Sequence, residues 1–320
     1  MTETNDSFGA LLDPIHGIGN VLKEVTATPP LDRPRLLFLR MREHEPQIHE
    51  LAELLSDQLV NYAIPLAKRQ KAFLSGSASN TGGDMAALQR LQREAKRLLV
   101  SFNEKNLGRY GEVGELVSYV VAVHFLGAAQ IAAKMALKTS SEMPVHGVDG
   151  LHARMEADGS VTFFLLESKV IPNATDASRE MLKSVAEHQA GRKRQLNELR
   201  LVSDLSNLDS LEGEAREAAK SYFNAYASNG NYLMRRDVHV GSLVFSESSY
   251  QDRLPRDFTK PMTIHEEHLE SLYAAKHDSF TATLKKQADD QGIDLGGCVV
   301  FLIAIPDVNE FKRIFAGLTK

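Results

Sequence analysis

Apolar residues recur along this chain with two different periods, which together predict a mixture of helices and strands. In residues 46–62 an apolar side chain returns every three or four positions, as is typical of one buried helix face. The members of this stripe are Ile48, Leu51, Leu54, Leu55 and Leu59. Continuous apolar runs of strand length predict buried strands. These runs lie at 35–40, 161–170, 238–247 and 298–305.

The rest of the pattern predicts further elements between these strands. Two more strands are predicted near 135–140 and 146–155, and helices at 84–103, 112–133, 176–200, 214–227, 264–290 and after residue 307. This alternation predicts an α/β fold in which helices flank a mixed sheet. The glycine-bearing segment 106–111 interrupts the pattern, so we place a domain boundary there. Residues 1–108 would then form a mainly helical N-terminal region with a partner-docking or regulatory role, and residues 109–320 a second domain.

Charged residues follow one of the buried strands without a polar transition. Residues 161–166 read Val-Thr-Phe-Phe-Leu-Leu, and Glu167-Ser168-Lys169 comes next. A charged side chain at the end of a buried strand must be paired, bound to an ion or placed there for chemistry. Because strand side chains repeat every two residues, Glu167 and Lys169 should lie on the same face.

The register of the predicted hairpin decides whether Asp149 joins them. A two-residue turn at 158–159 would set Asp149 opposite Ser168, whereas a three-residue loop at 157–159 sets it opposite Glu167. The longer loop, with its glycine in a left-handed bulge position, sorts the side chains into an apolar and a more polar face. The apolar pairs are Leu151–Leu165, Ala153–Phe163 and Met155–Val161, and the polar pairs are Arg154–Thr162 and Glu156–Ser160. Since such sorting fixes the register, we predict the longer loop.

A third carboxylate comes from the helix that precedes these strands. Glu115 borders an apolar stripe of that helix, whereas Glu112 lies in the first turn, where the helix dipole favours it. Simpler roles stay open, namely a surface position for Glu115 and a salt bridge between Glu167 and Lys169. The Glu-x-Lys spacing is weak evidence by itself because it occurs three times in the chain.

Converging carboxylates beside a lysine suit a hard divalent cation and the hydrolysis of a phosphodiester. We predict Mg²⁺, with Mn²⁺ as a substitute, bound by Asp149, Glu167 and Glu115 and by a carbonyl near Ser168. Lys169 would orient or deprotonate the attacking water, or stabilise the transition state.

Composition limits the possible partners. The chain of 320 residues is 43% hydrophobic and 25% charged, which is ordinary for a soluble globular protein. Its net charge is −5, so nucleic acid would have to bind local basic patches. Candidate patches are 68–71, 192–194 and 235–236. No glycine-rich phosphate loop is present, so we expect this chain to bind no nucleotide by itself.

Two further features bear on the location of the protein. The single cysteine, Cys298, excludes an internal disulfide and favours a reducing compartment. The longest apolar stretch, 116–137, contains His124, Gln130 and Lys134, which predicts a core helix and no membrane span.

Taken together, these motifs resemble those of a PD-(D/E)xK nuclease, although the Asp149 strand lacks the proline in the superfamily's name. More narrowly, several segments resemble the nuclease subunit of Hachiman-type anti-phage defence systems. These segments are Gly114-Glu115-Leu116, Lys134-Met135-Ala136-Leu137-Lys138-Thr139, Gly147-Val148-Asp149-Gly150-Leu151-His152, Leu166-Glu167-Ser168-Lys169 and Phe301-Leu302-Ile303-Ala304-Ile305-Pro306.

The resemblance implies a restriction-endonuclease-like core in residues 109–320, with its catalytic and metal-binding positions at Glu115, Asp149, Glu167 and Lys169. It implies a Mg²⁺-dependent deoxyribonuclease in the bacterial cytoplasm, which acts beside a superfamily 2 helicase and is restrained by it. Two other functions stay open. One is a catalytically silent adaptor that docks a helicase or DNA, and the other is a stand-alone restriction-type endonuclease.

Overall fold

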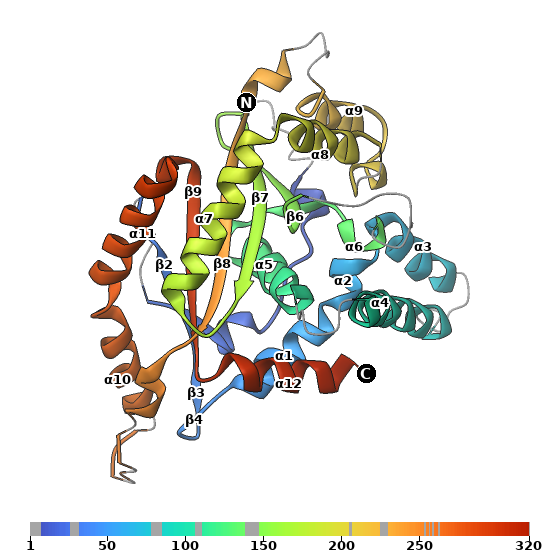
Figure 1. Cartoon of the computed structure of the whole chain (residues 1–320). Helices are drawn as coiled ribbons and strands as arrows, with labels where there is room; N and C mark the ends of the chain where they lie inside the picture. The colour runs from blue at the N-terminus through green and yellow to red at the C-terminus, as the bar shows by residue number, and fades with distance from the viewer. Residues whose placement is uncertain are drawn as a thin grey trace.

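The four continuous apolar runs lie side by side in the middle of a seven-stranded mixed sheet, in a computed structural model of the chain (Figure 1). They are β2 (Arg35–Leu39), β9 (Cys298–Ile305), β8 (Arg235–Ser246) and β7 (Val161–Val170), and neighbouring members pair in parallel. Parallel strands are buried on both faces, which explains why their sequences are apolar without alternation. The prediction of an α/β fold with a mixed sheet flanked by helices is therefore confirmed.

Three antiparallel strands complete the sheet at its two edges. β1 (Leu22–Glu24) pairs with β2, while β6 (Gly150–Met155) and β5 (Ala129–Ala132) follow β7 on the other side. A separate two-stranded ribbon consists of β3 (Met41–Arg42) and β4 (Glu45–Pro46). The structure describes residues 8–25, 32–77, 85–105, 111–137, 147–204, 207–224, 230–252, 254–255, 257, 259–261 and 263–319.

Helices cover both faces of the sheet. The helices of the described residues are α1 (Ile48–Asp57), α2 (Leu59–Ala63), α3 (Leu66–Ser77), α4 (Met85–Lys105), α5 (Gly111–Leu126), α6 (Lys134–Leu137), α7 (Ala174–Ala190), α8 (Arg192–Asp204), α9 (Gly213–Ser221), α10 (Thr263–Ala274), α11 (His277–Gln291) and α12 (Val308–Thr319). In Figure 1, α7 and α11 lie in front of the sheet and α5 lies behind it. A Cβ on Gly241 of β8 would lie 2.6 Å from Met181 of α7, and one on Gly114 of α5 would lie 2.7 Å from Ser168 Oγ. Hence α7 and α5 approach opposite faces of the same pair of strands.

The hairpin between β6 and β7 has the predicted three-residue loop. Leu151 pairs with Leu165, and the neighbouring pairs follow the same register to Met155 and Val161. Gly159 has a φ of +79° and donates its N–H to the Glu156 carbonyl. The sorting of apolar and polar pairs therefore identified the register correctly.

Two predicted elements around residue 130 are wrong. The helix predicted at 112–133 ends at Leu126, because Gly127 adopts a left-handed φ of +59° and the chain turns into β5. The strand predicted near 135–140 is instead the short helix α6, and residues 138–146 lie outside the described part. Both segments are apolar on either side of the break, so periodicity gave no sign of it.

Residues 1–108 contribute strands as well as helices. β1 and β2 belong to the same sheet as β7, β8 and β9. The division of the chain after residue 108 stays a prediction. In the described ranges, no helix is long and apolar enough to cross a membrane.

The close approach of α5 to β7 gives a test of this packing. We expect Gly114→Ala to lower the free energy of unfolding by about 1–3 kcal/mol, because its methyl group would overlap Ser168 and Val170. Helix propensity alone predicts the opposite sign, since alanine is the better helix former. Gly111→Ala is the matched control, because no atom of the described residues lies within 4 Å of a Cβ there. Urea unfolding measures both, and equal stability of the two variants would contradict this packing.

Candidate functional site

The candidate site lies where β7 extends past the start of β6. The β6–β7 ladder begins with the pair Gly150–Leu166, whereas β8 accompanies β7 as far as Val170. Residues 167–170 therefore have a strand neighbour on one side only. The chain that enters β6 carries Asp149 to this edge, and its N–H donates to the Leu166 carbonyl at 2.7 Å.

The Asp149 side chain accepts the hydrogen bond that a neighbouring strand would otherwise accept from Ser168. Its Oδ2 atom accepts hydrogen bonds from the backbone N–H of Ser168 at 2.7 Å and from Ser168 Oγ at 2.6 Å. Because the N–H and C=O of a strand residue point toward the same neighbouring strand, the Ser168 carbonyl faces the same edge. The carboxylate is thus fixed in the plane of the sheet, between its two faces.

Glu167 and Lys169 approach this point from the α7 face. They alternate with Ser168, which faces α5, and they form an ion pair of 2.7 Å. Their side chains are 12% and 21% exposed, so solvent reaches both. The salt bridge that the sequence left as a simple alternative is therefore present, but it lies next to Asp149 and not alone.

Glu115 approaches from the α5 face. It is buried and accepts a hydrogen bond of 2.5 Å from the Tyr62 hydroxyl of α2. The surface position that the sequence left open for Glu115 is wrong, because α5 is buried around most of its circumference. Glu115 and Glu167 thus reach the edge from opposite faces, and Asp149 lies between them.

Electrostatics shows that the three carboxylates influence one another. Burial, with the nearby charges of Glu167 and Glu115, raises the pKa of Asp149 from 3.8 to about 7 against the hydrogen bonds from Ser168. Burial also raises the pKa of the Tyr62 hydroxyl well above its usual value, and Glu115 and Asp149 add to the effect. Negative charge is therefore gathered at one place with little solvent to screen it.

Lys169 has the opposite balance. Burial disfavours its ammonium form, but the carboxylate of Glu167, with those of Asp149 and Glu180, outweighs burial and raises its pKa. The side chain is consequently a cation at neutral pH. This favours orientation of water or stabilisation of anionic charge over the role of a base.

The oxygen atoms of Asp149, Glu167 and Glu115 and the Ser168 carbonyl fit a hard divalent cation, which prefers oxygen ligands. A cation would also reduce the repulsion between the carboxylates. As they stand, however, the acids are bonded to internal partners, Asp149 to Ser168, Glu167 to Lys169 and Glu115 to Tyr62. Across the described ranges, no three or more His, Cys, Asp or Glu side chains are arranged as ready metal ligands. Binding of a cation would require these side chains to exchange partners.

Sequence reasoning missed the residues that support the Asp149 segment. Glu198 of α8 is buried, accepts the N–H of Val148 at 3.0 Å, and binds His188 Nε2 at 2.6 Å. The Lys134 ammonium of α6 donates to the Val148 carbonyl. These contacts join residues 10, 14 and 50 positions apart, and no local pattern indicates them.

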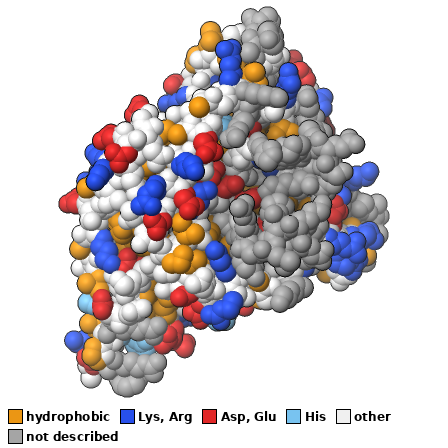
Figure 2. All heavy atoms as spheres, viewed as in Figure 1, with side chains coloured by type: hydrophobic (Ala, Val, Ile, Leu, Met, Phe, Trp, Pro, Cys, Tyr) orange, Lys and Arg blue, Asp and Glu red, His pale blue; other side chains and the backbone are white. Residues whose placement is uncertain are grey.

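Two of the three predicted basic patches, 68–71 and 235–236, contain residues that pair with neighbouring acids. Lys68 pairs with Glu94, and Arg69 is buried against Asp13. Figure 2 shows acidic and basic side chains interspersed over the α7–α11 side, with Lys and Arg gathered toward α3 and α4. DNA binding by these patches stays a prediction.

The sequence model of the family described as HamA matches residues 19–316, which is most of the chain and includes every candidate site residue. Neither a curated protein nor a solved structure matches the chain.

The raised pKa of Asp149 predicts a characteristic pH dependence. A carboxyl group with a higher pKa in the folded state stabilises the fold at low pH and loses that contribution as pH rises through the folded value. We therefore expect the free energy of unfolding to fall between about pH 4 and pH 7, by up to about 1.4 kcal/mol per pH unit. Asp149→Asn should flatten this slope, as measured by urea unfolding at a series of pH values.

The control for this experiment is Asp158→Asn in the hairpin loop. Hydrogen bonds from Ser160 lower the pKa of Asp158, so Asp158 cannot produce a loss of stability as pH rises. Parallel stability profiles for wild type and Asp149→Asn would contradict the electrostatic description of the site.

Proposed function

Because the chain belongs to the HamA family, and so is a component of a Hachiman anti-phage defence system, we propose that it is the metal-dependent DNA nuclease of that system. The proposal rests on one observation. Three carboxylates, those of Glu115, Asp149 and Glu167, lie close together beside Lys169, at an edge of the sheet that is partly exposed to solvent. An arrangement of this kind in a PD-(D/E)xK core cleaves phosphodiesters.

Asp149, Glu167, Glu115 and the Ser168 carbonyl would hold Mg²⁺, or Mn²⁺ in its place. The bound cation would lower the pKa of a water molecule and neutralise charge on the phosphate. Asp149 would be the central ligand of this set, because its pKa already responds to the charges of both glutamates. Occupation of the site would also remove the repulsion that raises its pKa.

Lys169 supplies positive charge to the reacting phosphate. In the present structure its ammonium group is held by Glu167. If Glu167 bound the cation, the Lys169 ammonium would be free to face the substrate. In that position it would orient the attacking water or stabilise the pentavalent transition state.

We further propose that a superfamily 2 helicase is the partner, which provides the ATP-driven step and restrains the nuclease. The chain has no glycine-rich phosphate loop for such a step. Acidic and basic side chains are interspersed on the α7–α11 side, with no large basic surface there to capture DNA (Figure 2), so a partner would share in DNA binding.

A catalytically silent adaptor is the second candidate. It is favoured by the internal partners of the acids, which form a closed set of hydrogen bonds and an ion pair. Calorimetric titration with Mn²⁺ separates the two functions. A nuclease site binds Mn²⁺ and loses affinity in Glu167→Gln, whereas an adaptor shows no binding that depends on Glu167.

Cleavage of linear DNA tests the nuclease directly. With Mg²⁺ present, we expect Lys169→Ala and Glu167→Ala to lower the cleavage rate at least about 100-fold, because each removes a charge that acts on the reacting phosphate or its cation. Lys183→Ala is the matched control, since Lys183 is an exposed lysine of the adjacent α7. The proposal fails if both site variants cut as fast as wild type, or if chelation of Mg²⁺ leaves cleavage intact.

A further inference from the structure

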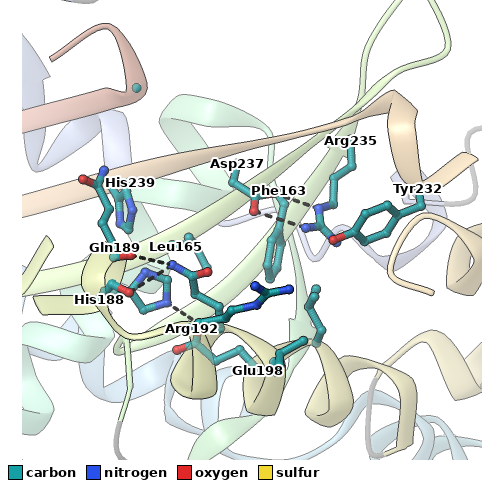
Figure 3. Close-up of a pocket in the computed structure, with 14 residues that line it drawn as sticks. Phe163, Leu165, His188, Gln189, Arg192, Glu198, Tyr232, Arg235, Asp237 and His239 are labelled. Carbon is teal, nitrogen blue, oxygen red and sulfur yellow. Dashed lines mark hydrogen bonds and ion pairs between the residues drawn. The ribbon is translucent and has the colours of Figure 1, made fainter. Parts of the chain in front are cut away.

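A second pocket lies apart from the carboxylate cluster (Figure 3). Its volume is about 370 Å³, and it is enclosed by the end of α7, by α8, and by the first residues of β7 and β8. Pockets of about 300–1,000 Å³ are typical of small-molecule sites. None of the proposed cleavage residues lines it.

One wall of the pocket is flat and rich in π-electrons. The Arg235 guanidinium lies 4.7 Å from the ring centre of Tyr232 and 5.5 Å from that of Phe163. Its Nε and Nη2 atoms donate to the two carboxylate oxygens of Asp237, at 2.7 and 3.2 Å, which fixes the plane. The Arg235 side chain is only 7% exposed, so the surface that this wall offers a base is the Tyr232 ring that it supports. Aromatic rings are surfaces on which nucleobases stack.

The opposite wall offers an unsatisfied hydrogen-bond acceptor. His188 is 5% exposed, and its buried Nδ1 atom has no hydrogen-bond partner among the residues that the structure describes. Its Nε2 atom faces the Glu198 carboxylate at 2.6 Å and so carries the ring proton. In the neutral ring Nδ1 is then an acceptor, and a ligand that donates an N–H would satisfy it. Ring N–H or exocyclic amine groups of nucleobases meet this requirement.

A cation completes the pocket. Figure 3 shows the Arg192 side chain extending between His188 and the wall around Arg235. Arg192 is exposed and forms no ion pair with any residue that the structure describes. The acids Asp237 and Glu198 are already engaged, so the charge of Arg192 is available to a single phosphate.

We propose that this pocket binds one nucleoside monophosphate unit, with the base between His188 and the Arg235 wall and the phosphate at Arg192. The sequence indicated no nucleotide binding because it lacks a triphosphate loop, but a monophosphate held by an arginine needs none. The unit can be a free nucleotide or a nucleotide of a DNA strand. Binding does not depend on the nuclease activity proposed above.

The pocket is linked to the carboxylate site through one side chain. Glu198 contacts His188 with one oxygen and the N–H of Val148 with the other, and Val148 precedes Asp149. A ligand at His188 therefore acts on the same hydrogen-bond chain that holds Asp149. A nucleotide bound at His188 can therefore alter the position of Asp149 through Glu198 and Val148.

Calorimetric titration in EDTA tests the proposal without cleavage. The probes are the four deoxynucleoside monophosphates, the matching deoxynucleosides, and a ten-residue single-stranded oligonucleotide. We expect at least one monophosphate to bind about tenfold or more tightly than its nucleoside, because of the charged contact with Arg192. Arg192→Gln should abolish that preference, and Tyr232→Leu should weaken nucleotide and nucleoside alike by about tenfold.

Two controls isolate the pocket. Arg200→Gln changes an exposed arginine of the same helix outside the pocket and should bind like wild type. Lys169→Ala should also bind like wild type, so failure of the nuclease proposal and failure of this one are distinguishable. Tighter binding of the oligonucleotide identifies a DNA strand as the source, and equal or weaker binding identifies a free nucleotide. Absence of all binding, or binding unaffected by Arg192→Gln and Tyr232→Leu, overturns the proposal.

Discussion

The two hydrogen bonds from Ser168 to Asp149 hold the candidate site together. These bonds, of 2.7 and 2.6 Å, join the segment before β6 to the free edge of β7, next to the last β6–β7 pair, Gly150–Leu166. This fixes the carboxylate in the plane of the sheet, so that side chains from both faces can reach it. Glu115 comes from the α5 side, and Glu167 with Lys169 comes from the α7 side. Without these hydrogen bonds no carboxylate would be held between Glu115 on one face and Glu167 on the other.

The same hydrogen bonds confine negative charge. A buried carboxylate between two others is unfavourable unless it is protonated or shares a counter-ion, and the raised pKa of Asp149 expresses that cost. In the present structure the acids are balanced by Ser168, Tyr62 and Lys169. The site is therefore in a closed arrangement, and a bound cation would have to displace Ser168 from Asp149 and Lys169 from Glu167. Glu198 holds the segment that carries Asp149, because it accepts a hydrogen bond from the N–H of Val148.

Much of this arrangement could be predicted from the sequence, for physical reasons. The central parts of the four parallel strands are apolar without alternation because both faces are buried. The hairpin register follows from Gly159 and from the sorting of its faces. Glu167 and Lys169 share a face because strand side chains alternate. The break at Gly127 was missed because apolar residues surround it on both sides. Tyr62, Glu198 and His188 were missed because their roles depend on contacts between distant segments, which no local spacing records.

The central claim is that Asp149, Glu167 and Glu115 share one cation at the free edge of β7. Anomalous diffraction from crystals grown with Mn²⁺ tests it most directly. The account predicts an anomalous peak within bonding distance of Asp149 and Glu167, with Lys169 separated from Glu167. Absence of a peak at that edge, with the Glu167–Lys169 pair unchanged at saturating Mn²⁺, would contradict it.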